Sequence, residues 1–124
     1  MTEQVNWSYA VQVAGGPVLA GAGVRAVDGY VKLSLTVPAG GTQSLEVLPG
    51  TGGAVQVLVI APGKPSDKLT YELDGNDVPL DGPHVLIGAG AVSLFAAKVG
   101  TLAFTNGTDE DAPIDVLAGR DATP

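Results

Sequence analysis

The fold of this chain is indicated most clearly by the stretch Gly53-Ala54-Val55-Gln56-Val57-Leu58-Val59-Ile60-Ala61-Pro62-Gly63, an apolar run of strand length bounded by glycines and a proline. Its three valines fall on one face of an extended chain, whereas Ala54, Leu58 and Ile60 fall on the other. A strand that is apolar on nearly both faces is covered on both sides. We therefore expect this run at the centre of a packed β structure.

Segments of alternating polarity precede this run. Residues Val5–Val13 alternate strictly, which is the cleanest period-two pattern in the chain and predicts a half-buried strand. Gly15-Gly16-Pro17 ends that strand, and Gly21 and Gly23 weaken a short second strand at 18–20. Asp28-Gly29 stands between the apolar residues 24–27 and the alternating residues 30–37, and this arrangement predicts a hairpin.

The rest of the chain continues as short strands separated by glycine and proline. Strands are expected at residues 43–48, 69–73, 78–80, 84–87, 91–97, 101–105 and 114–117, with a short helix as the alternative at 91–99. About eight to ten short strands at this spacing predict an all-β fold, an antiparallel, jelly-roll-like β-sandwich, with a closed barrel as the second choice. We expect a single domain at 1–118 and a C-terminal tail at 119–124.

Composition and charge exclude several classes of function. The chain has 124 residues, with 6 basic and 13 acidic side chains and a net charge of −7, so nucleic acid and anionic membrane surfaces should repel it. Cysteine is absent, which removes disulfides, thiolate metal sites and cysteine nucleophiles. The first residues form neither a basic nor an apolar segment, so we expect synthesis in the cytoplasm without a signal peptide.

The acidic turn near residues 74–81 is the best candidate metal site. Asp74, Asn76, Asp77 and Asp81 place oxygen atoms close together in the sequence, and oxygen is the ligand that calcium takes. Their spacing does not fit an EF-hand loop, and Asp, Asn and Gly are also the residues that any tight turn selects. We therefore predict no metal and no cofactor, with a calcium site at these four residues as the alternative.

The remaining motifs do not predict catalysis. His84, the single histidine, has no nucleophile signature beside it, so we interpret it as a residue at the start of a strand. Asp109-Glu110-Asp111 is typical of a solvated loop, and the sequon Asn106-Gly107-Thr108 carries no meaning without a secretory route. A glycosidase would need aromatic platforms around its paired carboxylates, and aromatic residues are few here. We expect a protein that is not an enzyme.

An interaction or structural role is therefore favoured. A small sandwich must protect its strand edges, and pairing with other copies is one solution. Val5, Trp7 and Tyr9 share a strand face, and together with Arg120 they are the expected interface residues. We also consider exchange of the strand at 5–13 between copies, with Gly15-Gly16-Pro17 as its hinge. The leading hypothesis is a self-associating β-sandwich, and the alternative is a ligand-binding β module for carbohydrate or calcium.

Part of the last third of the chain carries a family resemblance. Leu102-Ala103-Phe104-Thr105-Asn106 and Ile114-Asp115-Val116-Leu117-Ala118-Gly119-Arg120-Asp121 resemble the C-terminal portion of small β-rich virion proteins of tailed phages. The resemblance implies a capsid decoration (cement) protein, or a tail or spike component, that is found in the virion. Its partners would then be further copies of itself and a major capsid protein or another virion protein. No single residue carries over from that family.

Overall fold

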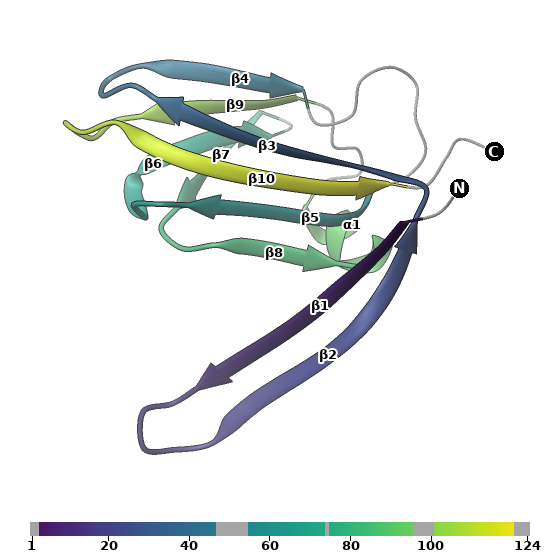
Figure 1. Ribbon diagram of the computed structural model, residues 1–124. Helices are drawn as coiled ribbons and strands as arrows, with labels where there is room; N and C mark the ends of the chain where they lie inside the picture. The colour runs from purple at the N-terminus through teal and green to yellow at the C-terminus, as the bar shows by residue number, and fades with distance from the viewer. Residues whose placement is uncertain (1–2, 47–54, 74, 96–100, 121–124) are drawn as a thin grey trace.

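The structure is a computed structural model, which describes residues 3–46, 55–73, 75–95 and 101–120. It is all-β, as expected, and consists of two four-stranded antiparallel sheets packed as a sandwich, together with a two-stranded hairpin that projects from them (Figure 1). We call the sheet β3-β10-β5-β8 the front sheet, the sheet β4-β9-β6-β7 the back sheet, and the β1–β2 hairpin the arm.

The front sheet contains residues 55–62 of the central apolar run as one of its strands. Its strands are β3 (Gly29–Val37), β10 (Ala112–Arg120), β5 (Val55–Pro62) and β8 (His84–Ile87). β5 lies between β10 and β8, so the prediction of a central strand is confirmed. Leu58 and Ile60 belong to the core between the sheets, and Val57 is also fully buried although it alternates with them along the strand. The strand is therefore covered on both faces.

The back sheet consists of β4 (Thr42–Glu46), β9 (Thr101–Asn106), β6 (Ser66–Leu73) and β7 (Asn76–Leu80). β6 and β7 form a hairpin, and Gly75 in its turn has a φ of 81°, a left-handed conformation that favours glycine. β9 and β10 are consecutive in the chain but belong to different sheets, so the loop between them crosses the sandwich.

The core lies between the two sheets and is formed by the inward-facing side chains of both. Tyr71 and Phe104 are its largest fully buried members, and their ring centroids lie 5.8 Å apart. The buried cluster consists of Val37, Val55, Leu58, Ile60, Leu69, Tyr71, Leu80, Val92, Leu102, Phe104, Ala112, Ile114, Val116 and Ala118. Burial of a set this large is the main source of stability in a sandwich of this size.

The arm differs from the prediction for the first part of the chain. It consists of β1 (Glu3–Gln12) and β2 (Val18–Val27), which pair with each other along their whole length. The predicted hairpin around Asp28-Gly29 is wrong, because β2 pairs with β1 while β3 pairs with β10. Gly15-Gly16-Pro17 lies at the closed end of the arm, where Gly16 N–H donates to the Val13 carbonyl at 2.7 Å. Within a single copy it is therefore the turn between β1 and β2.

Two further boundaries differ from those expected. The predicted strand at 91–97 is wrong, because the chain forms the short helix α1 (Ala89–Phe95), which was the alternative there. β10 continues through Gly119 and Arg120, two positions past the expected end of the domain at 118. The final positions of the strands predicted at 43–48 and 91–97 lie outside the described residues.

Asn106 is the buried polar residue that fastens the loop between β9 and β10. Its side-chain amide donates to the carbonyls of Val37 at 3.0 Å and Glu110 at 2.7 Å. Its side-chain oxygen accepts from the Thr108 backbone N–H at 2.9 Å and the Thr108 hydroxyl at 2.6 Å. Because Asn106 is fully buried, these bonds replace all of its contacts with water. The sequon asparagine is therefore a structural residue.

We predict that Asn106→Ala destabilises the protein by about 2 to 3 kcal/mol, because the buried Val37 carbonyl loses a donor and the Thr108 backbone N–H loses its acceptor. The free energy of unfolding should be measured by urea titration. Thr105→Ala is the matched control, because Thr105 precedes it on the same strand and is exposed. A loss for Asn106→Ala no greater than that for Thr105→Ala would contradict the assigned role.

Candidate functional site

The arm is unusual for an exposed part of an acidic protein because it carries almost no charge. Residues 4–24 include no Asp, Glu, Lys, Arg or His, although the whole chain has 19 Asp, Glu, Lys and Arg side chains (6 + 13). The same segment contains six of the large hydrophobic side chains that are exposed among the described residues: Tyr9, Val11, Val13, Val18, Leu19 and Val24. A long, uncharged pair of strands with free edges is a surface that other chains readily contact.

The register of the arm divides its side chains into two faces. Trp7 lies opposite Gly23, Tyr9 opposite Gly21, and Val11 opposite Leu19. Side chains directly opposite each other in an antiparallel pair project from the same face. One face, which we call the Trp7 face, is therefore formed by Val5, Trp7, Tyr9, Val11 and Leu19, with Arg25 opposite Val5 at the root of the arm. The other face is formed mainly by small and polar residues, among them Asn6, Ser8, Ala10, Ala20 and Ala22.

Gly21 and Gly23 make room for the two aromatic rings of the Trp7 face. A Cβ atom at position 23 would lie 2.6 Å from Trp7 Cζ2, and one at position 21 would lie 2.8 Å from the Tyr9 ring. The two rings are nearly parallel, with an interplanar angle of 8° and a centroid distance of 6.1 Å. Rings that cover glycines across a strand pair in this way stabilise a ribbon that has little else to pack against. The glycines therefore belong to the strand and do not break it.

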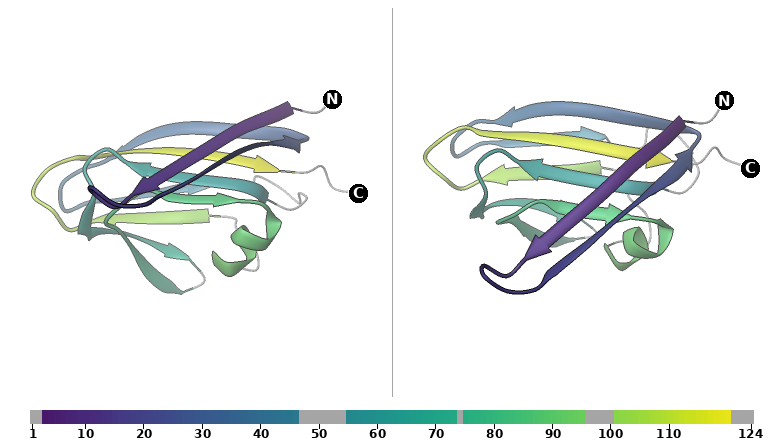
Figure 2. Two further views of the ribbon diagram at one scale, coloured as in Figure 1. Left: turned by 90° about the horizontal axis from the view of Figure 1, so that it is seen from below. Right: turned by 60° about the horizontal axis from the view of Figure 1, so that its bottom comes forward.

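The root of the arm rests on the outer face of the front sheet. Val27 is buried, and a Cβ at Gly119 would lie 3.1 Å from its Cγ1 atom. The Arg25 guanidinium donates to Gln56 Oε1 through Nη2 at 2.6 Å and Nε at 3.1 Å. A hollow of about 280 Å³ remains between Glu3, Gln4 and Val5 on the arm and Tyr30 and Leu117 on the sheet. From this root the arm crosses the outer side of the sheet diagonally and extends past β8 (Figure 2).

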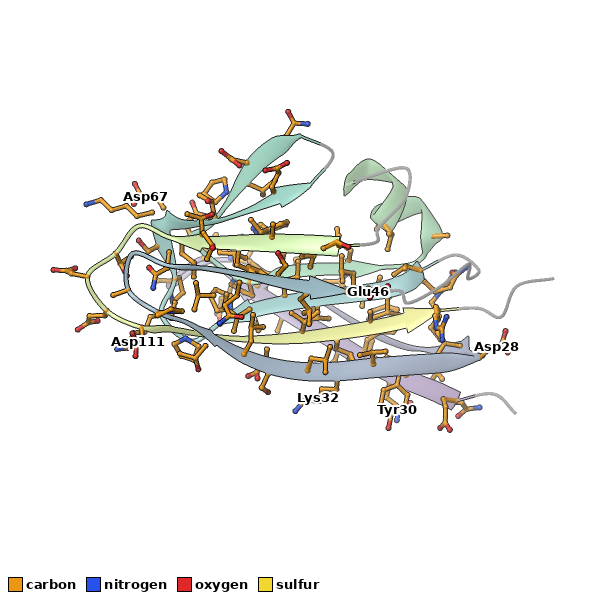
Figure 3. All side chains as sticks on the ribbon, turned by 90° about the horizontal axis from the view of Figure 1, so that it is seen from above. Asp28, Tyr30, Lys32, Glu46, Asp67 and Asp111 are labelled. Atoms are coloured by element: carbon orange, nitrogen blue, oxygen red, sulfur yellow. The ribbon has the colours of Figure 1, made fainter. Side chains whose placement is uncertain are left out.

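The outer face of the front sheet is itself partly apolar. Val59 lies opposite Val85 in the register of β5 and β8, on the face away from Leu58 and Leu86, which pack in the core. Val85 is 54% exposed, and Tyr30 on β3 is 57% exposed. Figure 3 shows Tyr30 and Lys32 projecting from β3 away from the sandwich. Tyr30, Val85 and the arm account for all the large hydrophobic side chains that are exposed in the described part of the chain.

The four expected interface residues lie at two places. Val5 and Trp7 are half-buried and Tyr9 is 47% exposed, all on the Trp7 face. Arg120 lies at the end of β10, where its backbone carbonyl accepts from Asp28 N–H at 2.9 Å, next to the root of the arm. Val11 and Leu19, the most exposed members of the Trp7 face, are not among the interface residues expected from the sequence. The register rule for a hairpin closed near Gly15 would have placed them opposite each other.

Three of the four calcium candidates lie within the described residues, at the two ends of β7. Asn76 and Asp77 begin β7 and Asp81 follows its end, whereas Asp74 lies outside the described residues. Within the described ranges, no group of three or more His, Cys, Asp or Glu side chains is arranged to hold a metal ion. A polar hollow of about 490 Å³ occurs elsewhere, between Ser66–Lys68 and Gly107–Asp109, with Lys68 as its cation.

His84 is the first residue of β8, as the sequence analysis expects. Its Nδ1 atom lies 2.7 Å from the hydroxyl oxygen of Tyr71, a fully buried core residue. Burial raises the pKa of the Tyr71 hydroxyl far above its ordinary value, so the phenol stays neutral in the fold. A hydrogen bond to a neutral, buried phenol gives the imidazole a role in packing, because it supplies a partner for a polar atom in the core.

The chain matches no protein-family model, no curated protein sequence and no solved structure. The described part of the chain contains no helix long and apolar enough to cross a membrane. Among the described residues, the exposed large hydrophobic side chains lie on the arm and on the outer face of the front sheet, so these two surfaces are the candidate binding surfaces.

We predict that Gly23→Ala displaces the Trp7 ring, because the added methyl group would occupy the space of the indole. Trp7 is the only tryptophan in the chain, so its fluorescence emission reports on the arm directly. The emission should shift to longer wavelength as the indole gains contact with water, while the melting temperature of the sandwich changes little. Gly82→Ala is the control, since a Cβ there meets nothing within 4 Å. Identical spectra for both variants would contradict the close approach of Trp7 and Gly23.

Proposed function

We propose that this protein is a non-catalytic structural protein that associates with copies of itself through its arm. The observation that carries the proposal is the uncharged stretch of the arm, residues 4–24, on which the Trp7 face is exposed beyond the root. An isolated two-stranded hairpin is only marginally stable in water. The arm, with ten residues in each strand, therefore gains stability when a partner covers it. Aromatic residues and a lack of charge are features of the cores of protein interfaces.

The charges of the chain predict how such an association responds to salt. Each copy carries a net charge of −7, so two copies repel each other at long range. An interface that lacks charged groups does not depend on attraction between ions and adds no further repulsion. Association through the arm should therefore not weaken when salt is added, since salt screens the repulsion between the copies.

We predict that the purified chain forms a defined oligomer whose dissociation constant stays constant or falls between about 0.1 M and 1 M NaCl, the range over which screening becomes nearly complete. Sedimentation velocity over a wide range of concentration should be used to measure it. An interface built on ion pairs would give the opposite salt dependence. A species that remains monomeric at the highest concentration in high salt would refute self-association.

The setting that we propose is the virion of a tailed phage, with capsid decoration as the role. This part rests on the resemblance of residues 102–106 and 114–121 to small virion proteins. Most of these residues belong to β9 and β10, the inner strands of the two sheets, so the resemblance concerns the sandwich. The arm would then supply the contacts by which such a sandwich bridges neighbouring subunits.

The virion setting predicts that the genome encoding this chain also encodes capsid and portal proteins close by, and that the chain is a stoichiometric component of its purified particles. Quantitative mass spectrometry of gradient-purified virions should be used, with the major capsid protein as the internal reference. A chain that is abundant in the infected cell but missing from the particles would rule out the virion role. That result would leave the self-association of the purified protein untouched.

A further inference from the structure

The free half of the arm and the outer face of the front sheet are two apolar surfaces of one molecule that do not cover each other. On the arm, Val11 is 65% exposed and Leu19 is 68% exposed. On the sheet, Val85 is 54% exposed although it lies on the face that the arm crosses. Within one copy, the contacts described above join the two surfaces at the root of the arm, through Val27 and Arg25.

The β5–β8 half of the outer face matches the Trp7 face in chemistry. The outward side chains that stay accessible are those of Val59, Ala61, Val85 and Ile87, none of which carries a charge, whereas Val57 on the same face is already fully buried within one copy. The charged residues of this face, Lys32 and Asp115, lie on the other two strands, β3 and β10. An uncharged ribbon that lies clear of the Arg25 guanidinium at Gln56 and Gly88 can cover the rest of this half without burying an unpaired ion, which would cost several kcal/mol for each ion.

The two surfaces also match in size. The free half of the arm, from Ser8 to the turn at Gly15, is about 23 Å long, and the eight residues of β5 extend for about 26 Å. A ribbon of two strands is about 10 Å wide and so covers roughly 230 Å² of projected area. Stable complexes bury about 800 Å² of accessible surface on each partner, so a single arm contact is small. Two equivalent contacts related by a two-fold axis double the area, and they also cover the free surfaces of both copies.

From these observations, and on the basis of the self-association proposed above, we propose which surfaces meet and that the partner is a second copy of this chain. The free half of one arm packs through its Trp7 face on the β5–β8 half of the front sheet's outer face in the second copy, and the second arm does the same in return. The arm root already packs on the same outer face within each copy, so the intermolecular contact extends an existing mode of packing.

The first test compares three lysine substitutions by sedimentation velocity. Val11→Lys places a charge on the Trp7 face and Val85→Lys places one on the receiving face, and each should weaken association at least about tenfold, which corresponds to 1.4 kcal/mol. Val24→Lys is the matched control, because Val24 is 60% exposed on the opposite face of the same arm, and it should leave association unchanged. Each lysine lowers the net negative charge of the chain, so added repulsion between copies cannot explain a loss.

The second test uses the absence of cysteine from the chain. Val11→Cys and Val85→Cys each introduce a single thiol, and an equimolar mixture under mild oxidation should form the mixed disulfide dimer faster than either variant cross-links with itself. Ser44→Cys, on the exposed part of β4 in the back sheet, should form no mixed disulfide with Val11→Cys above the level of random collision. Because all of the substituted side chains are exposed, the variants should keep the melting temperature of the unmodified chain.

Four results would overturn the proposal. If Val24→Lys weakens association as much as Val11→Lys while Val85→Lys has no effect, the arms contact each other or another surface. If Val11→Cys cross-links with itself and not with Val85→Cys, the sheet is not the partner of the arm. If the oligomer persists in all three lysine variants, the arm interface is wrong although self-association stands. If the unmodified chain is monomeric, the proposed self-association is wrong as well. This result differs from a persistent oligomer, so failure of the arm interface and failure of self-association can be told apart.

Discussion

The pairing of β10 with both β3 and β5 is the interaction on which the rest of the structure depends. β10 comes last of the described strands, yet it lies inside the front sheet and pairs with β3 along all nine residues. Until it does so, β3 and β5 have no common partner, and the core side chains of β10, Ala112, Ile114, Val116 and Ala118, have nothing to pack against. β10 also fixes the origin of the arm, because the Arg120 carbonyl accepts a hydrogen bond from Asp28, directly before β3.

This dependence separates what the sequence could predict from what it could not. Alternation of polar and apolar side chains depends on local chain geometry, so the strands at 5–13, 30–37 and 55–62 were predictable from the residues themselves. The partner with which each strand pairs does not follow from local chain geometry. β3 pairs with residues that are about eighty positions further along the chain, and no local pattern in Tyr30–Val37 specifies that partner. The Asp28-Gly29 pair suggested a hairpin because it is a good turn sequence, but the neighbouring strands belong to different sheets.

The arm shows the same limit for the candidate interface. Trp7 and Tyr9 could be selected from the sequence because they share a strand face with Val5. From the sequence alone, Gly21 and Gly23 weaken a strand, because glycine has no side chain with which to support one. In the structure they lie opposite the two rings, which need the space that a Cβ atom would fill. A residue that weakens a strand in isolation can therefore be required by the residue across from it, and only the register reveals which case applies.

The network around Asn106 has a consequence for the chemical lifetime of the protein. Asparagine followed by glycine is the sequence at which deamidation is usually fastest, because the glycine backbone nitrogen can attack the side-chain amide and close a succinimide ring. Here the Gly107 nitrogen donates to the Lys68 carbonyl at 2.8 Å, while both ends of the Asn106 amide are held by other hydrogen bonds. Ring closure would require all of these groups to leave their partners. The fold thus protects the Asn106-Gly107 dipeptide from deamidation for as long as the loop keeps these hydrogen bonds.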